Sequence, residues 1–520
     1  MLLCTAEQMR AMDQYTIRDI GLPGRVLMEL AGRGVAEAVG NSIDSASGSE
    51  VLVIAGPGNN GGDGLVAARH LADKGAKVTV VLMTDPDRLQ GNALANYESL
   101  RSFPVCIRPV RTNEELQDAL AGEWDAVVDA LLGTGLSKPV TGMYAQAVEL
   151  ANTINAFKVA VDIPTGVDSD HGRIMGTAFI ADISVTFGMA KVGHFVYPGR
   201  EYCGFVKVID ISIPQLAIQD TGISGFTPES WTVAPFFTAR HASAFKNDFG
   251  HLLIVGGSPG KAGAILLAGE SALRTGAGLV TLATSKQTQT SLEGRVPDLM
   301  VEDLYEFNDG NLHFDKARLD GLVLGKTAIV VGPGLGVSTG VADLIRTLAG
   351  YGLPMLLDAD ALNTLAMHRE LLPIVHGAVL TPHPGEAARI LQADGGAAIQ
   401  ADRMAAVIDL QKVTGCVIVL KGAGTLTMGM DGQVTVNTSG GPGLAVAGTG
   451  DCLTGVIGAL LAQGLTRIDA AWVGAYIHGL AGELAADEFG EYGVTASEVS
   501  RCIPLVIKEL SFADNSKTTY

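Results

Sequence analysis

Short apolar runs alternate with amphipathic segments along most of this chain. The runs are rich in β-branched residues, which is typical of buried parallel strands, and the segments between them have the apolar spacing of helices. In the first half the runs are Val51 to Ala55, Val78 to Leu82, Ala126 to Asp129 and Val159 to Asp162. The alternation predicts a doubly wound α/β sheet, in which ligands bind at the carboxyl ends of the strands.

Two helices are expected before the first strand. The segment from Thr5 to Gln8 fits a capping box, and Met9, Met12 and Ile17 would then share the buried face of a helix. A second helical pattern covers Val26 to Val39. The chain is therefore expected to enter its sheet through helices.

The strand and helix pattern lapses once, between about Gln215 and Pro235, where helix and strand breakers interrupt it. We therefore expect two α/β domains, over residues 1–220 and 230–512, followed by a polar, frayed tail from Ala513 to Tyr520. The strand-like runs of the second series are His251 to Val255, Leu279 to Ala283, Ala328 to Val331, Met355 to Asp358, Ala378 to Thr381 and Val417 to Lys421.

The composition fits two cores and narrows the range of partners. A chain of 520 residues is too long for one ordinary core, and two domains of roughly 200 to 300 residues are the natural division. The formal net charge of -19 would repel a nucleic-acid backbone or an anionic membrane, so neither nucleic acid nor membrane is expected as a partner. The phosphate groups of a small ligand would have to be bound by local features of the chain.

The cysteines and the first residues indicate a cellular location. The six cysteines have no CxxC spacing, which favours a reducing compartment without structural zinc. The N-terminal segment lacks a basic stretch followed by a long apolar core, so we expect no signal peptide and a cytoplasmic protein. The longest uncharged apolar stretch, Cys452 to Leu465, is shorter than the roughly 20 residues of a spanning helix and is expected to be a buried helix.

A glycine-rich loop directly follows the first predicted strand, with the sequence Gly-Pro-Gly-Asn-Asn-Gly-Gly-Asp-Gly from Gly56 to Gly64. Glycines permit a positive φ and a close approach of the backbone to a ligand, while Asn59, Asn60 and Asp63 supply donors and acceptors. At the head of a helix, the backbone N–H groups would also attract an anion. The alternative is a tight turn capped by polar residues, but five glycines in nine residues exceed what a turn requires.

Two later strand ends carry acids toward the same edge of the sheet. Asp129 precedes Gly133-Thr-Gly135, and Asp162 precedes Pro164-Thr-Gly166. A single aspartate in such a position is more often a helix cap or a loop anchor. Three polar strand ends in one domain nevertheless favour a ligand site.

A second anion-binding loop lies in the other half of the chain. Ala447-Gly-Thr-Gly-Asp451 precedes an apolar helical run, so the amides of Gly448 to Gly450 could form an anion hole at a helix start. Asp451 would be either an N-cap or a base that takes a proton from a hydroxyl attacking a phosphate. The base is favoured because a lysine loop from Lys421 and a glycine turn after Asn437 lie nearby in sequence, although a strand-end lysine alone usually reaches solvent.

The first-half motifs resemble the NAD(P)HX epimerase domain, a Rossmann-like fold whose family acts on hydrated, damaged NAD(P)H. The matching sequences are GPGNNGGDG, VDALLGTG and DIPTGVD, and TAEQMRAMD resembles the first helix of that family. The resemblance implies a K+ ion held by Asn60, Asp129 and Thr165, an all-oxygen set suited to a hard cation, with Thr165 standing where the family often has serine. The implied substrate-binding residues are Asn59, Asn60, Gly61, Gly62, Asp63, Gly133, Thr134, Gly135, Leu136, Ser137, Lys138, Pro139 and Asp162.

Asp162 is the candidate catalytic group of this first site. The C6 hydroxyl of the hydrated ring lies beside the ring nitrogen, so it could be protonated, expelled and returned as water to the other face. One carboxyl group acting first as acid and then as base would serve.

The second-half motifs resemble the ribokinase-like superfamily, and within it the ADP-dependent or ATP-dependent NAD(P)HX dehydratases. The matching segments are Gly256 to Ser258, Lys261 to Ala264, Gly332 to Gly336, Asp358 to Asn363, Thr381 to Glu386, Lys421 to Thr425 and Ala447 to Asp451. The resemblance implies contacts to the hydrated dinucleotide from Ala264, Gly336, His383 and Asp451. It implies that the adenine nucleotide is held by Lys421, Gly422, Ala423, Gly424, Thr425 and Gly450.

Phosphorylation of the C6 hydroxyl, with Asp451 as the base, would replace a poor leaving group by phosphate. Mg2+ is expected for this transfer, although no acidic cluster specifies its ligands. ADP is favoured over ATP on the compactness of the chain alone. His383, between two prolines, could instead only fix a loop, and Glu386 could cap the helix that begins near Pro384.

The leading hypothesis is a bifunctional enzyme, a homo-oligomer, that epimerises NADHX and NADPHX and dehydrates their S forms. One alternative is a ribokinase-like kinase of a small molecule such as a vitamin precursor, because the anion hole and Asp451 would serve it equally. Another alternative is a first half that is only a binding module. Such scaffolds tend to lose polar strand ends like Asn60, Asp129 and Asp162.

Overall fold

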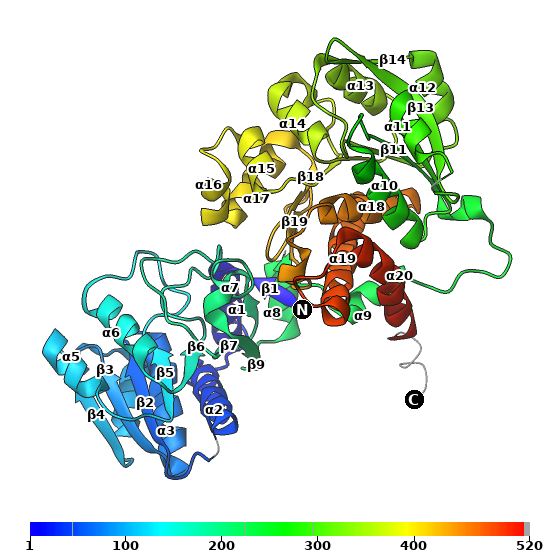
Figure 1. Ribbon diagram of the computed structural model, residues 1–520. Coiled ribbons are helices and arrows are strands. Elements are labelled where there is room, and N and C mark those ends of the chain that lie inside the picture. The colour runs from blue at the N-terminus through cyan, green and yellow to red at the C-terminus, as the bar shows by residue number, and fades with distance from the viewer. Residues whose placement is uncertain (44, 224, 295, 514–520) are drawn as a thin grey trace. The chain divides into compact units, whose positions relative to one another are not determined.

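The computed structural model describes residues 1–43, 45–223, 225–294 and 296–513. The chain divides into an N-terminal unit, from Leu2 to Gly225, and a C-terminal unit, from Phe226 onward together with Met1 (Figure 1). The short strand β10 (Gly225–Phe226) lies at the division. The polar tail expected from Ala513 lies outside the described residues from residue 514 onward.

A wholly parallel sheet forms the centre of the N-terminal unit. Its strands are β2 (Glu50–Ala55), β3 (Lys77–Leu82), β4 (Val105–Pro109), β5 (Ala126–Ala130), β6 (Phe157–Val161), β7 (Ile183–Phe187) and β9 (Phe205–Ile209). The strand order is β4-β3-β2-β5-β6-β7-β9. The chain therefore builds outward in one direction from β2 and in the other from β5, and the gap between these strands is the switch point where open α/β sheets bind ligands. This sheet confirms the predicted doubly wound fold.

Helices cover both faces of this sheet. They are α1 (Ala6–Arg18), α2 (Gly24–Ser42), α3 (Asn59–Asp73), α4 (Gly91–Leu100), α5 (Asn113–Leu120), α6 (Gly142–Thr153), α7 (Arg200–Cys203) and α8 (Gln215–Thr221). Alternate strand residues point to opposite faces. Val51 and Val53 of β2 belong to the cluster with α2 and α3, whereas Leu52 and Ile54 belong to the cluster with α5 and α6. Burial on both faces explains the continuous apolar runs of the sequence.

The helix α1 follows its sequence prediction with one exception. The capping box over Thr5–Gln8 is present, with both of its reciprocal hydrogen bonds. Met9 and Met12 are buried as expected, but Ile17 is 40% exposed. Thr16 takes the buried position instead, because its hydroxyl donates to a carbonyl one turn earlier and is satisfied inside the helix.

A larger, mostly parallel sheet forms the centre of the C-terminal unit. Its strands are β11 (His251–Val255), β12 (Leu279–Ser285), β13 (Met300–Asn308), β14 (Asn311–Phe314), β15 (Ala328–Val331), β16 (Met355–Leu357), β17 (Val379–Leu380), β18 (Val417–Leu420), β19 (Leu426–Met428) and β20 (Val434–Val436). The order β14-β13-β12-β11-β15-β16-β17-β18-β19-β20 has antiparallel pairs only at its two ends. Asp358, Thr381 and Lys421, which the pattern included in strands, lie just beyond their carboxyl ends.

The helices of the C-terminal unit pack on this sheet around one buried helix. They are α9 (Ser230–Val233), α10 (Ala262–Arg274), α11 (Lys286–Leu292), α12 (Lys316–Val323), α13 (Thr339–Ala349), α14 (Asp360–Met367), α15 (Pro384–Leu391), α16 (Gly396–Ala401), α17 (Arg403–Thr414), α18 (Thr449–Ala462), α19 (Arg467–Phe489) and α20 (Ala496–Ala513). The helix α18 confirms the buried helix expected from Cys452. It packs closely on α10, because a Cβ at Gly455 would lie 2.0 Å from the Ala268 carbonyl oxygen.

All six cysteines are free thiols, and Cys106 is the exposed one. Within the described ranges, no helix combines the length and the apolar character needed to cross a membrane.

Candidate active sites

A cavity of about 520 Å³ opens at the carboxyl edge of the N-terminal sheet, beside the switch point between β2 and β5. Ile17, exposed on α1, is part of its wall. The predicted substrate residues that line it are Asn59, Asn60, Asp63, Gly133, Thr134, Gly135, Leu136 and Asp162. The predicted residues that do not line it are Gly61, Gly62, Ser137, Lys138 and Pro139.

The glycines of the first loop serve close packing rather than a left-handed backbone. None of the five between Gly56 and Gly64 has a positive φ, so only the second of their two expected uses, a close approach of the backbone, is found. A Cβ at Gly61 would instead lie 1.9 Å from the Gly56 carbonyl oxygen, and one at Gly56 would lie 2.1 Å from the Leu131 carbonyl oxygen. The loop is thus folded tightly onto itself and onto the segment after β5, and α3 begins at Asn59 in the wall of the cavity.

Two of the three predicted K+ ligands, Asp129 and Thr165, meet at one buried carboxyl group. Asp129 is 1% exposed and accepts hydrogen bonds from the Thr165 amide at 2.7 Å and the Thr165 hydroxyl at 2.8 Å. Burial raises the pKa of Asp129 to about 6. No basic side chain of the described residues pairs with it. A buried carboxylate without a counter-charge is costly, so a bound cation would stabilise this site.

Asn60, the third predicted ligand, lies beside Gly133 and gives a second indication of a ligand at this edge of the sheet. Its side-chain Nδ2 is buried without a hydrogen-bond partner among the described residues. Turning the amide over would place its carbonyl oxygen there, since oxygen and nitrogen of an amide are assigned from their partners. Carboxylate, hydroxyl and amide oxygens together form the kind of donor set that a hard cation accepts. The residues therefore fit the K+ ion that the resemblance implies.

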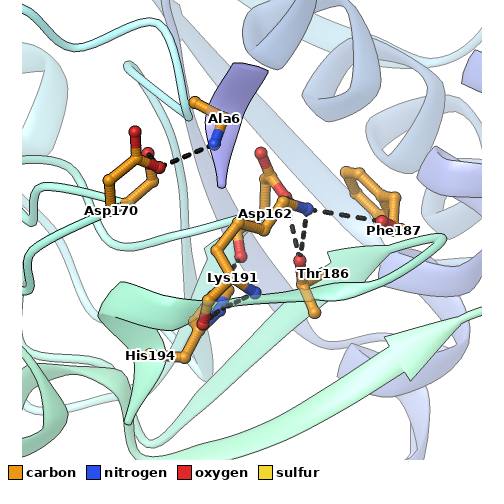
Figure 2. A network of polar contacts seen from close by, with 8 residues as sticks. Ala6, Asp162, Asp170, Thr186, Phe187, Lys191 and His194 are labelled. Atoms are coloured by element: carbon orange, nitrogen blue, oxygen red, sulfur yellow. Dashed lines mark hydrogen bonds and ion pairs between the residues drawn. The ribbon is translucent and has the colours of Figure 1, made fainter. Parts of the chain in front are cut away.

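Asp162 is held in a strained conformation at the end of β6. Its φ is +66°, in the left-handed region that residues other than glycine rarely adopt, and such strain concentrates at functional sites. The Lys191 ammonium donates to Asp162 Oδ1 at 2.6 Å, to the Thr186 hydroxyl at 2.8 Å and to the Phe187 carbonyl at 3.3 Å (Figure 2). The Thr186 hydroxyl donates to the same carboxyl oxygen at 2.9 Å. This network fixes one oxygen of Asp162 and leaves the other, Oδ2, near Gly133.

Lys191 and Asp13 are two charged residues of this site that sequence reasoning missed. Lys191 is 1% exposed, it lines the cavity, and it belongs to β8 (Ala190–Lys191), which pairs in parallel with β1 (Leu2–Cys4). Burial works to raise the pKa of Asp162, but the adjacent ammonium outweighs burial and holds that pKa below its usual value. Asp162 is therefore an ionised carboxylate at neutral pH.

Two further carboxyl groups face the same cavity. The side chain of Asp63, on α3, is buried and makes no hydrogen bond or ion pair with any described residue. Burial, followed by the charges of Asp162 and Asp13, raises its pKa well above the usual value. Burial also raises the pKa of Asp13 to about 6. The cavity thus combines an aspartate whose pKa is lowered with one whose pKa is raised, the kind of pair that acid and base catalysis uses.

The second candidate site lies where β15 to β18 of the C-terminal sheet end side by side. Lys421 donates to Asp358 Oδ1 at 2.8 Å, and Thr454 of α18 donates to Asp358 Oδ2 at 2.6 Å. Burial works against both charges of the ion pair, yet Lys421 lowers the pKa of Asp358 and Asp358 raises that of Lys421. The sequence motif contained Asp358, but its role as the partner of Lys421 was not predicted.

The Gly-Thr-Gly-Asp loop begins α18 as expected. Gly448, the N-cap, has a φ of +93°, and a Cβ at Gly450 would lie 3.6 Å from the Lys421 ammonium nitrogen. Asp451 lies in the first turn, where burial, followed by repulsion from Asp358, raises its pKa to about 6. A lysine, a helix N-terminus and a proton acceptor therefore meet at one point.

His383 and Glu386 form the cap of α15. The His383 amide donates to Glu386 Oε2 at 2.9 Å, and His383 Nδ1 accepts from the Gly385 amide at 3.0 Å. The His383 side chain is 51% exposed, whereas that of Glu386 is 6% exposed and lies 4.0 Å from the Lys421 ammonium. Burial raises the pKa of Glu386 to about 7. Glu386 therefore has the cap role suggested from the sequence. The same side chain contacts His383 and lies near Lys421.

The two remaining predicted substrate contacts, Gly336 and Ala264, lie in the segments that follow β15 and β11. The Gly336 amide donates to Asp360 Oδ2 at 2.8 Å, and the Lys261 ammonium binds the same oxygen at 3.0 Å. Ala264 lies in the first turn of α10. A Cβ added at Gly334 would lie 3.3 Å from the Cβ of Ala264. The predicted residues thus follow successive strand ends.

Mg2+ has no preformed protein cage in this structure. Among the described residues no group of three or more His, Cys, Asp or Glu side chains is arranged to hold a metal ion. This agrees with the usual behaviour of Mg2+ in phosphoryl transfer, where the ion is held largely by water and substrate phosphates.

The geometry of these two sites defines a class of protein. Each combines the N-terminus of a helix with a carboxyl group at the carboxyl edge of a parallel sheet, which is the arrangement of an enzyme that binds a phosphate-bearing ligand. Two such sites in separate units define a bifunctional enzyme.

Comparison with known proteins identifies the family. Residues 252–505 match the family described as NAD(P)H-hydrate dehydratase, and residues 24–193 match the YjeF-related protein N-terminus. The bifunctional NAD(P)H-hydrate repair enzyme Nnr of Thermofilum pendens is 37% identical over 98% of this chain and 97% of its own length. That of Moorella thermoacetica is 38% identical over 98% and 97%. The chain belongs to the family of bifunctional NAD(P)H-hydrate repair enzymes.

A solved structure also resembles the C-terminal unit. The ADP/ATP-dependent NAD(P)H-hydrate dehydratase from Bacillus subtilis, co-crystallized with ATP/Mg2+, is 27% identical, with a TM-score of 0.45, over 54% of this chain and 97% of that one.

Proposed function

We propose that the N-terminal cavity epimerises the R and S forms of NADHX and NADPHX. The observation that carries this proposal is the convergence of Asn60, Asp63, Gly133 and Asp162 on one cavity at the switch point of the sheet. A cavity of about 520 Å³ is large enough for a small-molecule ligand. The full-length similarity to bifunctional repair enzymes supplies the substrate.

The division of charge in the cavity suggests how the reaction proceeds. Asp63, whose pKa is raised by burial, donates a proton to the C6 hydroxyl, and the C6–O bond breaks to release water while the ring nitrogen stabilises the cation. A second water then attacks the other face of C6 and loses a proton to the Asp162 carboxylate. Exchange of protons with water then returns both carboxyl groups to their starting states. This differs from the single-carboxyl scheme, because Lys191 keeps Asp162 from acting first as an acid.

Two substitutions test the epimerase. Asp162→Asn and Asp63→Asn should each lower the rate of R to S conversion by about 10²-fold or more, the usual contribution of a proton-transfer group. Asp73→Asn, an exposed change on the same helix as Asp63, should retain the wild-type rate. Conversion is followed by separating the two epimers, after subtracting the spontaneous rate. Wild-type conversion by Asp162→Asn would remove that residue from the mechanism.

We propose that the C-terminal site dehydrates the S form at the expense of ADP. The observation that carries this proposal is the meeting of Lys421, Gly450 and Asp451 at the start of α18. Asp451 takes the C6 hydroxyl proton, and the oxygen attacks the terminal phosphorus of ADP with AMP as the leaving group. Phosphate then leaves C6 as C5 loses a proton. Mg2+ would supply charge neutralisation on the nucleotide phosphates.

The nucleotide and the substrate occupy different parts of this site in the proposal. Residues 421–425 and Gly450 hold the nucleotide, and Ala264, Gly336 and His383 face the dinucleotide. Wild-type protein given S-NADHX, Mg2+ and either ADP or ATP should regain reduced-nicotinamide absorbance with ADP in preference to ATP. Recovery with neither nucleotide would exclude the dehydratase and leave the ribokinase-like kinase as the alternative. Cytoplasmic location and homo-oligomeric assembly remain expectations of the sequence.

A further inference from the structure

Arg403 is a buried cation that the proposed reaction does not use. It is 1% exposed, and among the described residues it forms no ion pair with a carboxylate. Burial lowers the pKa of its guanidinium to about 10, so the group remains charged at neutral pH. Arg403 is also the first residue of α17, the end of a helix where a positive charge is unfavourable. Neither a salt bridge nor the stability of its own helix accounts for it.

The contacts of Arg403 are to the nucleotide loop at residues 421–425. Its Nη2 donates to the carbonyls of Leu420 at 3.2 Å and Gly424 at 3.3 Å, and its Nη1 donates to the Lys421 carbonyl at 3.4 Å. Nη1 also donates to Gln400 Oε1 at 2.8 Å. The helix α17 packs against β18 and β19, which the loop connects (Figure 1). One guanidinium therefore spans both ends of the loop.

The loop is wrapped around this guanidinium. Gly422 has a φ of +134°, and a Cβ there would lie 2.7 Å from Arg403 Nη1, so only glycine permits the approach. The carbonyls of Lys421 and Gly424 point inward to Arg403, whereas the amides from Gly422 to Gly424 donate no hydrogen bond to any described residue. Backbone N–H groups arranged in this way form an anion-binding concavity.

The cost of burial indicates a function for the charge. Taking an ion out of water costs several kcal/mol, and three neutral carbonyls compensate for that cost less well than a carboxylate would. An apolar residue would pack here at lower cost but could not hold the carbonyls inward. Arginine at this position therefore costs stability, but it fixes the loop and places a positive charge beneath an anion-binding surface.

We propose that Arg403 is the positioning residue of the adenine-nucleotide site, holding the 421–425 loop with its amides turned toward the nucleotide phosphates. The inference rests on the proposed dehydratase function. Arg403 touches neither nucleotide nor substrate and acts through the loop. Its replacement should weaken nucleotide binding without affecting the dinucleotide.

Steady-state kinetics of the full-length protein test this role. Arg403→Met should raise the KM for ADP at least tenfold while the KM for S-NADHX changes less than twofold. Arg403→Lys keeps the charge but loses the planar fork that reaches several carbonyls, so it should raise the KM for ADP about threefold to tenfold. Lys412→Met, which removes an exposed positive charge from the same helix, is the matched control and should leave both constants unchanged.

Two internal readouts separate the possible failures. Thermal unfolding of the full-length protein reports whether the C-terminal unit of each variant is folded, and calorimetric titration with ADP measures nucleotide binding without turnover. An unchanged KM for ADP in Arg403→Met, or an equal rise in both KM values, contradicts the inference. If Arg403→Met does not fold, the Arg403→Lys variant decides in the same way. If wild-type protein itself neither binds ADP nor dehydrates S-NADHX, the proposed function fails rather than the role of Arg403.

Discussion

Replacing Lys191 by methionine should destabilise the N-terminal unit, by an amount that grows with pH. In the wild-type protein the ammonium is 1% exposed and lies 2.6 Å from Asp162 Oδ1. Its charge keeps the pKa of Asp162 low, so the stabilisation by this carboxylate is complete above about pH 4 and is lost only as the pH falls through the lowered pKa. In Lys191→Met the stability of the N-terminal unit should instead decrease as the pH rises, because the buried Asp162 carboxylate has lost its counter-charge.

The magnitude can be worked out from the geometry of the pair. Removing one partner of a buried ion pair costs about 3–5 kcal/mol, because the remaining charge is left without compensation. With the ammonium gone, burial would raise the pKa of Asp162, so the penalty is largest above that raised pKa and shrinks as the pH falls below it. For a unit of this size the loss corresponds to a decrease in Tm of about 10 °C near neutral pH.

Differential scanning calorimetry at pH 5 and pH 8 measures the effect. The double variant Lys191→Met with Asp162→Asn removes both charges and should regain most of the lost stability at pH 8. A loss below about 1 kcal/mol at pH 8, or equal losses at the two pH values, would show that the ion pair does not hold Asp162 ionised.

Three other predictions concern the separate sites. Asp451→Asn should lower the rate of dehydration by at least 10²-fold while leaving epimerisation intact. The wild-type rate of dehydration should rise as the pH passes about 6, where Asp451 loses its proton. A parallel rise in the variant would contradict the role of Asp451 as the base. Replacing K+ by a bulky organic cation should slow epimerisation by the wild-type protein but not by Asp129→Asn. The rates are measured by separating the two epimers. An equal effect on both proteins would argue against a cation at Asp129. Thr5→Ala should lower the unfolding free energy by about 1 kcal/mol through loss of the capping box, and a change below about 0.3 kcal/mol in urea unfolding would contradict this role of Thr5.

Local pattern along the chain was enough to predict most of the strands and the edge at which the first site lies. The acids after the apolar runs, Asp129 and Asp162, lie at the sheet edge because parallel strands end together. The prediction that Ile17 is buried was wrong. Apolar spacing cannot identify Thr16 as the buried residue, because threonine counts as polar even when its hydroxyl is hydrogen-bonded within the helix. The glycines after β2 were predicted for a positive φ and for close backbone approach, and only the second reason applies, because either one alone requires glycine.

The partners of the charged groups could not be predicted in this way. Lys191 lies 29 residues from Asp162, and Asp358 lies 63 residues from Lys421. Each pair forms only when segments that are far apart in the sequence come together in the fold. Arg403 gave no signal at all, because a basic residue at a helix start is ordinarily a solvated surface residue. Whether the predicted substrate contacts touch ligand remains a prediction.

Two separate activities in one chain can be tested together by the recovery of NADH from a mixture of R and S hydrated NADH with ADP and Mg2+. We expect complete recovery by wild-type protein, recovery of only the S fraction by Asp162→Asn beyond the spontaneous rate, and no recovery by Asp451→Asn. Complete recovery at the wild-type rate by Asp162→Asn, or nucleotide-dependent recovery at the wild-type rate by Asp451→Asn, would contradict the assignment of one activity to each site.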